Sequence, residues 1–193
     1  QPALRFVNPG NPDLKSEIVQ TSELGLELGF LKNRIKLSGT YYKGVTKDAL
    51  FTPTQPPSSG LLNQIQNIGV IENTGVELAL NATIIQKNKH NLNVSLSYNN
   101  NENTVTSMGG SAPFNVGGFT VIGSWVEEGQ SLGYLRGTAA VSNGDGTYSF
   151  NPNTALGKTF APNFGSVSLN YSWDKLNLFI SGDYQTGGEI VDL

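Results

Sequence analysis

The chain has 193 residues, a formal net charge of −3 and a sequence pI near 5.1, so it offers no electrostatic basis for binding nucleic acid. It contains no cysteine, which excludes disulfides, thiolate catalysis and zinc–thiolate sites. Charged residues make up only 14% of the chain, against the roughly 25% that is usual in soluble domains. No segment approaches the roughly 20 consecutive apolar residues of a membrane helix.

Alternating apolar and polar residues, with Gly, Asn and Pro between the alternating segments, predict an all-β fold. In chain order we expect six long strands that form an antiparallel meander, at about residues 19–31, 34–43, 74–85, 91–101, 164–173 and 176–185. A turn at residues 32–33 places Phe30 opposite Ile35, and a turn at residues 174–175 places Trp173 opposite Leu176. In both hairpins this register gathers the apolar side chains on one face.

The connections between these strands are strongly unequal in length. Residues 32–33, 86–91 and 174–175 form short polar turns, whereas residues 44–73 and 102–163 form long loops. In a meander, alternate connections lie at opposite ends of the sheet, so the sequence predicts one end of tight turns and one end of long loops. Outer-membrane β-barrels show this asymmetry, with short periplasmic turns and long external loops.

The two faces of the predicted strands differ in chemistry. One face is aliphatic and we expect it to contact outer-membrane lipid, and its members include Leu26, Leu37, Leu78, Val94, Leu169 and Leu178. The other face carries mainly small polar residues, as a wet barrel lumen requires. Aromatic side chains near the strand ends predict a membrane-interface girdle formed by Phe30, Tyr41, Tyr98, Trp173 and Tyr184. The alternative is a set of aromatic cross-strand pairs in a soluble core.

The polar residues do not form a recognisable catalytic set. Glu23 and Glu27 share a face but lie roughly 13 Å apart at about 3.3 Å per residue, beyond the about 5 to 9.5 Å of a glycosidase pair. Glu27 lies diagonal to Lys36 on the polar face, which predicts a luminal ion pair. The only histidine, His90, lies in a Lys/Asn-rich turn and is expected to be solvated. We therefore predict no enzyme activity, no metal and no cofactor.

The long loops contain three segments of interest. "SNGDGTYSF" (residues 142–150) predicts a hairpin turn at Asn-Gly or Asp-Gly, with a calcium loop as the less favoured reading. "FTPTQPPSSG" (residues 51–60) predicts an exposed loop that is either a spacer or a surface for a partner. Residues 119–137 carry Trp125, Tyr134 and Arg136, which are candidates for substrate contact, the alternative being packing within the loop.

Several segments together resemble a known family. They are "NPDLKSE", "GLELGFLKNRIKLSGTYYKGVTKDALF", "NIGVIENTGVELAL", "EEGQSLGYLRG" and "SWDKLNLFISGDYQTGG", and they follow the order found in the C-terminal barrel portion of SusC/RagA-type TonB-dependent outer-membrane transporters. The resemblance implies a barrel of about 22 strands in the bacterial outer membrane, with an N-terminal plug and a TonB-contacting motif. It also implies a SusD-type surface lipoprotein as partner and glycans or peptides as substrates.

The sequence therefore predicts that residues 1–193 are one part of such a barrel, with the plug domain and the remaining strands outside this chain. Partnership with the lipoprotein and with TonB would then involve those other parts. The expected function is that of a wall segment of a TonB-dependent importer. The alternative is a soluble β-sandwich adhesin or carbohydrate-binding module, in which the long loops would cover the apolar face.

Overall fold

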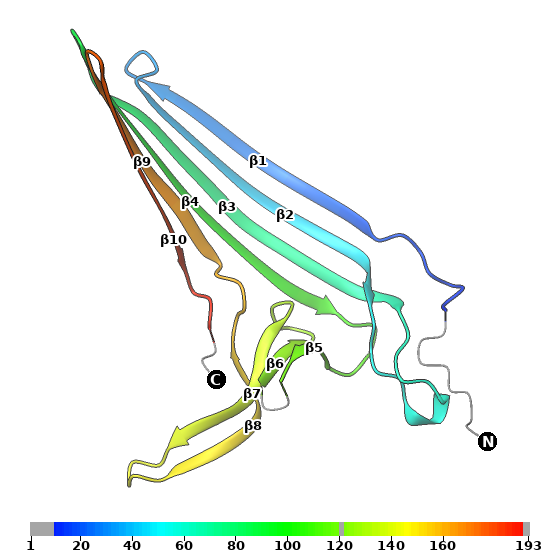
Figure 1. Cartoon of the computed structure of the whole chain (residues 1–193). Helices are drawn as coiled ribbons and strands as arrows, with labels where there is room; N and C mark the ends of the chain where they lie inside the picture. Colours follow the sequence, from blue (N-terminus) through cyan, green and yellow to red (C-terminus); the bar gives the residue numbers. More distant parts are fainter. Residues whose placement is uncertain (1–9, 120–121, 191–193) are drawn as a thin grey trace.

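The computed structural model describes residues 10–119 and 122–190 and contains two antiparallel sheets (Figure 1). The larger sheet has six strands in the order β1 (Ile18–Phe30), β2 (Ile35–Phe51), β3 (Gln66–Lys87), β4 (His90–Ser107), β9 (Asn163–Trp173) and β10 (Leu176–Thr186). The smaller sheet has four strands in the order β5 (Phe114–Gly118), β6 (Ile122–Val126), β7 (Tyr134–Ser142) and β8 (Tyr148–Gly157). Among the described residues, no helix has the length and apolar character needed to cross a membrane.

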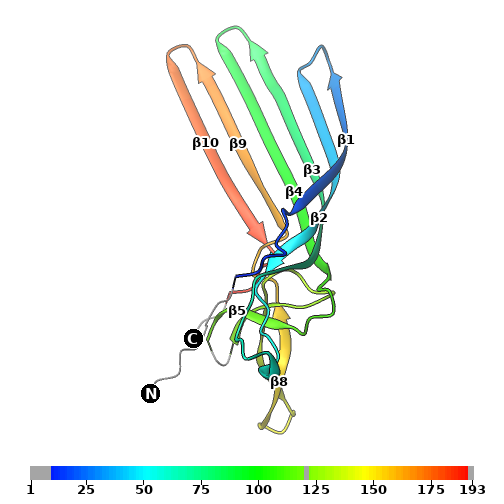
Figure 2. The ribbon, with the colours of Figure 1, turned by 90° about the vertical axis from the view of Figure 1, so that its right-hand side faces the viewer.

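The six-stranded sheet consists of three long hairpins, whose short turns lie together at one end (Figure 2). We call this end, with the turns at residues 31–34, 88–89 and 174–175, the turn end, and we call the opposite end the loop end. The predicted pairs Phe30–Ile35 and Trp173–Leu176 are present in the ladders, so the predicted register is confirmed. The small sheet is inserted between β4 and β9, which are neighbours in the large sheet.

The register carries an apolar face and a polar face across all six strands. Two rows of the apolar face are Phe30–Ile35–Ala82–Val94–Leu169–Ile180 and Leu26–Gly39–Leu78–Tyr98–Gly165–Tyr184. A row of the polar face between them is Glu27–Ser38–Ala79–Ser97–Ser166–Asp183. All six residues predicted to contact lipid lie on the apolar face, where Leu24 and Leu26 are 76% and 62% exposed. No described element forms a second layer over this face.

On the polar face, small polar side chains of neighbouring strands form hydrogen bonds with one another. The hydroxyls of Ser97 and Ser166 lie 2.8 Å apart, and the Ser95 hydroxyl donates to Asn81 Oδ1 at 2.8 Å. Hydroxyl and amide side chains are short, and they can make these cross-strand bonds close to the sheet. Long charged side chains would extend further into the space in front of it. The polar face thus carries short side chains that bond to one another across the strands.

Three strands run further toward the loop end than the sequence predicted. β2, β3 and β4 continue past residues 43, 74 and 101 into segments expected to be loops, and Phe51 still pairs with Gln66. In these extensions both faces carry polar residues, so the apolar alternation that marks a strand is lost while the backbone ladder continues. A bulge at Asp48, with φ of 56°, interrupts the β2 extension. The Pro-rich segment is a loop, as predicted, with one short 3-10 turn at Pro57–Ser59.

The second long connection, expected to be a loop, forms the small sheet and its projecting β7–β8 hairpin (Figure 1). The hairpin turn predicted within "SNGDGTYSF" is confirmed, because the Asn143 amide donates to the Thr147 carbonyl at 3.0 Å. The strands of this sheet are short, with five residues each in β5 and β6. An alternating segment of only five residues cannot be distinguished from a loop by its sequence.

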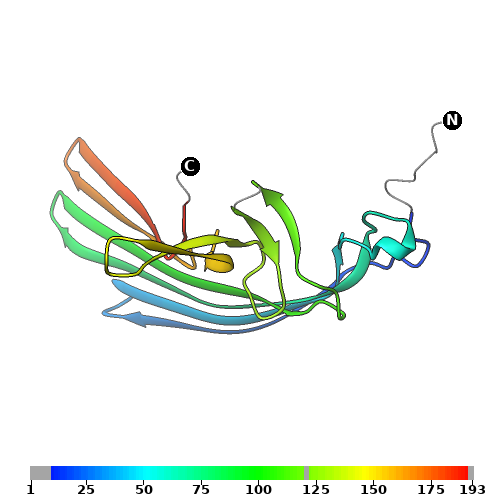
Figure 3. The same cartoon turned by 90° about the horizontal axis from the view of Figure 1, so that it is seen from below.

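A small hydrophobic core joins the two sheets at the loop end. Val105, Met108, Phe114 and Val126 are buried together, and the rings of Phe51 and Phe114 meet edge to face with centroids 5.7 Å apart. Backbone bonds add to this junction, because Gly129 donates to the Val105 carbonyl at 2.8 Å and Val105 donates to the Gln130 carbonyl at 2.9 Å. The small sheet is thereby anchored to the end of β4, while the large sheet remains a curved open layer with β1 and β10 at its edges (Figure 3).

The prediction for His90 is correct in its exposure but wrong in its position, because the residue is exposed and yet lies in a strand with side-chain contacts. His90 is the first residue of β4, its ring stacks on Trp173 with centroids 5.7 Å apart and 7° between the planes, and its Nδ1 lies 2.7 Å from the Tyr171 hydroxyl. Lys89 beside it forms an ion pair with Asp174 at 2.6 Å. These contacts join the β3–β4 turn to the β9–β10 turn. The sequence missed them because β4 and β9 are adjacent in the sheet but more than sixty residues apart in the chain.

Candidate ligand site at the loop end

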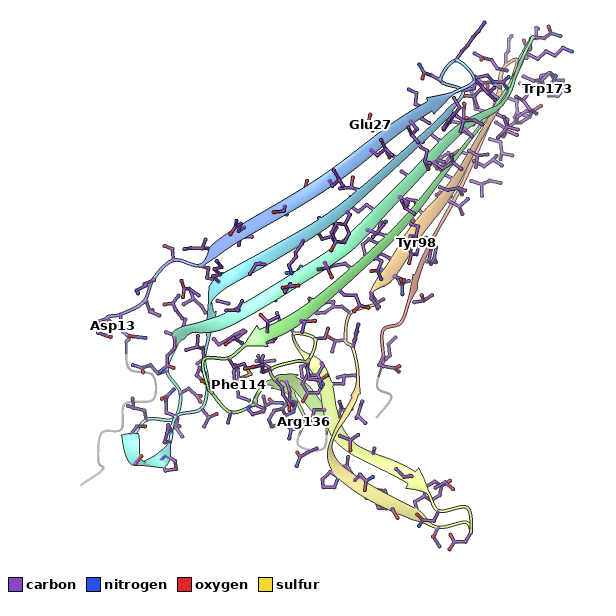
Figure 4. The ribbon with its side chains drawn as sticks, turned by 180° about the vertical axis from the view of Figure 1, so that it is seen from behind. Asp13, Glu27, Tyr98, Phe114, Arg136 and Trp173 are labelled. Atoms are coloured by element: carbon purple, nitrogen blue, oxygen red, sulfur yellow. The ribbon has the colours of Figure 1, made fainter. Side chains whose placement is uncertain are left out.

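The small sheet brings together the three residues that the sequence proposed for substrate contact. Trp125 on β6 pairs directly with Tyr134 on β7, and Arg136 lies two residues further along β7. Figure 4 shows Arg136 near Phe114 at the loop end, far from Trp173 at the turn end. Of the candidate segment 119–137, residues 120–121 lie outside the described residues.

Arg136 is held in place by an aromatic ring and a carboxylate. Its guanidinium carbon lies 4.5 Å from the centroid of the Trp125 ring, and its Nη1 lies 3.4 Å from Glu127 Oε2. The guanidinium is thus stacked as a cation on an aromatic face. Arg136 Nε is buried and has no hydrogen-bond partner among the described residues. The side chain is therefore positioned by two contacts and still has donor capacity that the protein does not use.

Tyr134 has a different role from its two neighbours. Its side chain is 3% exposed and its hydroxyl donates to Glu127 Oε2. Burial, followed by the hydrogen bond and charge of Glu127, raises the pKa of Tyr134 to about 12. A buried hydroxyl already bound to a carboxylate is not available to a ligand, so we correct the expectation of substrate contact for Tyr134. It positions Glu127, which in turn contacts Arg136.

Trp125 and Arg136 line a cavity of about 510 Å³. Other lining residues are Asn115, Phe119, Thr138, Pro152 and Asn153. The cavity thus offers an indole face, a guanidinium and two amides, and its described lining contains no Asp or Glu. These groups can stack on an apolar surface and donate hydrogen bonds to carbonyl, hydroxyl or carboxylate oxygens. They include no acid–base pair.

In the turn of the projecting hairpin, the carboxylate of Asp145 accepts its hydrogen bonds from a residue of the same turn. Asp145 accepts hydrogen bonds from the Thr147 amide at 2.9 Å and from the Thr147 hydroxyl at 2.6 Å. These bonds hold the pKa of Asp145 below its usual value. Within the described part of the chain, no three His, Cys, Asp or Glu side chains gather in a way that could bind a metal ion.

The proposed ion pair and girdle occupy the faces that the sequence assigned to them. Glu27 and Lys36 line one cavity on the polar face, but the ion pairs recorded between described residues do not include this pair, which stays a prediction for the closed barrel. Tyr98 and Tyr184 share a row of the apolar face. The remaining girdle residues are exposed on that face, with Tyr41 toward the loop end and Phe30 and Trp173 at the turn end. Their role at a membrane interface stays a prediction.

Comparison with known proteins supplies a family. The TonB dependent receptor-like β-barrel family matches residues 1–184. The TonB-dependent receptor P39 of Formosa agariphila is 30% identical over 196 residues, which cover 96% of this chain and 18% of that protein. The TonB-dependent receptor SusC of Bacteroides thetaiotaomicron is 34% identical over 101 residues, which cover 52% of this chain and 10% of that protein.

Solved structures give the same result. The structure of the RagAB peptide transporter superposes with a TM-score of 0.76 and 26% identity, over 93% of this chain and 22% of that one. The RagAB peptide importer in its open-open state superposes with a TM-score of 0.76 and 25% identity. The chain spans about a fifth of the length of these relatives. The alternative prediction of a soluble β-sandwich is therefore wrong, and the described sheet corresponds to part of a barrel. The chain belongs to the TonB dependent receptor-like β-barrel family and is part of a SusC/RagA-type outer-membrane receptor, not of an enzyme.

Proposed function

We propose that this chain forms part of the barrel of a TonB-dependent importer that takes up glycans or peptides together with a SusD-type surface lipoprotein. The observation that carries the proposal is the six-stranded register with one apolar and one small-polar face. Such a sheet can separate lipid from a hydrated lumen. The likeness to RagAB, a peptide transporter, supports an import role and a peptide as one candidate substrate class.

Trp125 and Arg136 contact the substrate at the external mouth of this importer. The indole face can stack on the apolar face of a sugar ring or on an apolar peptide side chain. The guanidinium can donate to a hydroxyl, a carbonyl or a carboxylate. Because Arg136 is already fixed by Trp125 and Glu127, little side-chain entropy is lost when a ligand binds.

The lipoprotein partner contacts exposed parts of the loop end. Tyr148 and Phe150 are 61% and 68% exposed on the projecting β7–β8 hairpin, and their ladder partners are Ser142 and Ala140. Exposed aromatic residues with a low entropy cost are typical anchors of protein interfaces. The Pro-rich loop at residues 51–60 is a second candidate contact surface. Energy for transport comes through TonB.

Uptake by cells that produce the complete receptor and its lipoprotein tests the proposal. Labelled oligopeptides and labelled oligosaccharides are offered separately, and accumulation is measured with and without TonB. We expect one class to accumulate in a TonB-dependent way. We further expect Trp125→Ala and Arg136→Gln to lower the uptake rate by roughly tenfold each, as the loss of a stacking or charged contact worth about 1.4 kcal/mol.

The matched control is Lys158→Gln, which removes a cation of the loop end that lies outside this cavity and pairs with Glu102. Surface amounts of each variant are measured with an antibody so that folding defects are separated from transport defects. Equal uptake by the control and by the two site variants would remove Trp125 and Arg136 from the proposal. Accumulation of neither class, with or without TonB, would contradict the import function itself.

A further inference from the structure

The turn end of the large sheet concentrates positive charge. Five of the chain's twelve Lys and Arg residues lie there with a single acid, Asp174, whereas the rest of the chain has seven cations and fourteen acids. The five cations are Lys32, Arg34, Lys87, Lys89 and Lys175. All five side chains belong to exposed residues. A chain with a net charge of −3 thus carries a locally cationic end.

Two of these five cations already have protein partners. Arg34 donates to the carbonyls of Thr83 and Ile84 at 2.9 to 3.2 Å, across the bulge in β3. Lys89 pairs with Asp174 at 2.6 Å. Among the described residues, no carboxylate pairs with the remaining three, Lys32, Lys87 and Lys175. Three ammonium groups at the turn end are therefore free to bind an external anion.

The position of Lys87 points to the membrane as the source of that anion. Lys87, His90, Trp173 and Leu176 form one row across β3, β4, β9 and β10, and this row is the last one of the apolar face. Trp173 and Leu176 are 51% and 56% exposed, and His90 holds the Trp173 ring by stacking on it. Figure 4 shows Trp173 at this tip. A cation and an indole at the edge of an apolar face are the groups that occupy the headgroup region of a bilayer.

We propose that the turn end binds phosphate groups of phospholipid headgroups, with Lys87 and Lys175 as the cations and Trp173 and Leu176 as the apolar contacts. The proposal rests on the barrel assignment but not on the nature of the imported substrate. Short turns of outer-membrane barrels face the periplasm, so the leaflet concerned is the inner, phospholipid leaflet. A soluble acidic protein is a poorer occupant, because it would have to enter the membrane to reach a row of the lipid-facing surface.

Lipid retention by the complete receptor tests the proposal. The receptor is purified in a neutral detergent and titrated with phosphatidylglycerol, and bound lipid is counted by native mass spectrometry. The variant Lys87→Gln/Lys175→Gln is compared with Lys15→Gln/Lys47→Gln, which removes the same charge from exposed residues nearer the loop end. A lysine near an anionic surface contributes roughly fivefold in affinity. We expect phosphatidylglycerol to bind between about fivefold and 25-fold more weakly to the first variant and within about twofold of wild type to the control.

Three further measurements make the result decisive. A phosphate-free glycolipid should not be retained, and the wild-type affinity for phosphatidylglycerol should fall as salt is raised, because salt screens exposed charges. The variant Lys87→Arg/Lys175→Arg keeps both charges and should retain the lipid, which separates charge from folding. Equal losses in the two Gln variants, salt-independent binding, tighter binding of lipid A, or displacement of the lipid by polyglutamate would each overturn the proposal.

Discussion

At the residue scale, the loop-end site depends on one shared carboxylate. Glu127 accepts from the Tyr134 hydroxyl and lies 3.4 Å from Arg136 Nη1, while Arg136 stacks on Trp125. The buried tyrosine therefore fixes the carboxylate, the carboxylate fixes the guanidinium, and the guanidinium and indole together face the cavity. This order of contacts explains why one of the three sequence candidates is buried while the other two line the cavity.

Tyr134→Phe tests this arrangement through pH. With a pKa of about 12 in the folded state, against about 10 in the unfolded state, Tyr134 binds its proton more tightly when the small sheet is folded. Its contribution to stability is therefore complete below pH 10 and is lost as pH rises from 10 to 12. In the complete receptor, the tyrosinate absorbance difference between wild type and Tyr134→Phe should report one group that titrates near 12. We expect the substitution to cost about 1–2 kcal/mol at neutral pH.

A titration of that one tyrosine near its ordinary pKa of about 10 would contradict the buried contact with Glu127. The control is Tyr148→Phe, on the exposed tip of the projecting hairpin, which should leave the stability unchanged. An equal loss of stability in the two variants would show that the Tyr134 hydroxyl contributes nothing specific.

At the element scale, sequence predicts the membrane-facing parts of strands far better than their extensions. In β1, β9 and β10 apolar and polar residues alternate over most of the strand, with Phe179 on the polar face as an exception, so both bounds and register were predictable. In the loop-end parts of β2, β3 and β4 apolar and polar residues are mixed on both faces, so the strands continue without the alternation that marks a strand in sequence. The small sheet was not predicted for the same reason. Hydrogen bonds join residues 127–133 to the end of β4, and these long-range contacts have no local signal in the sequence.

The contacts between neighbouring turns could not be predicted from the sequence either. His90 stacks on Trp173 only because β9 returns beside β4 after the small sheet, and this pairing has no local signal. By contrast, the turn at residues 143–147 was predictable, because Asn-Gly and Asp-Gly are favoured where φ is positive. Local chemistry thus predicted turns and faces, while long-range neighbours had to come from the structure.

The assignment of faces is testable by single cysteines, since this chain has none. Leu37→Cys and Leu78→Cys place a thiol on the apolar face, while Ser38→Cys and Ala79→Cys, one residue further along each strand, place it on the polar face. In membranes that contain the complete receptor, we expect the polar-face thiols to react on the order of tenfold faster with a water-soluble maleimide. A membrane-soluble maleimide should show the reverse preference. Equal labelling of neighbouring positions by both reagents would contradict the two-faced sheet.

At the scale of the whole molecule, the described chain has two unlike ends joined by an apolar surface. The loop end holds the small core of Val105, Met108, Phe114 and Val126 and the candidate ligand cavity. The turn end holds the cations and the stacked His90–Trp173 pair. Between them the apolar face stays uncovered, with Leu28, Leu78 and Leu96 each about two-fifths exposed. Lipid and neighbouring barrel strands are what such a surface requires.

The 193-residue polypeptide by itself is therefore expected not to form a stable soluble monomer. In water it would expose an apolar surface larger than the few hundred Å² that monomers usually tolerate. It would also leave the backbone groups of β1 and β10 unpaired at the two sheet edges, where other chains can add. Detergent would cover the apolar face but not the edges, because unpaired backbone groups cost several kcal/mol each in an apolar medium.

Size-exclusion chromatography of residues 1–193, with and without detergent, measures the oligomeric state and so tests this expectation. We expect aggregates in the void volume without detergent, and polydisperse oligomers in detergent as edges pair between copies. The complete receptor in detergent serves as the control and should elute as a defined species, because a closed barrel has no free edge. A sharp monomer peak of residues 1–193 in plain buffer, with a cooperative thermal transition, would mean that the long connections fold back over the apolar face. The loop-end core could then no longer be the only buried cluster among the described residues, and the division into a lipid face and a lumen face would have to be abandoned.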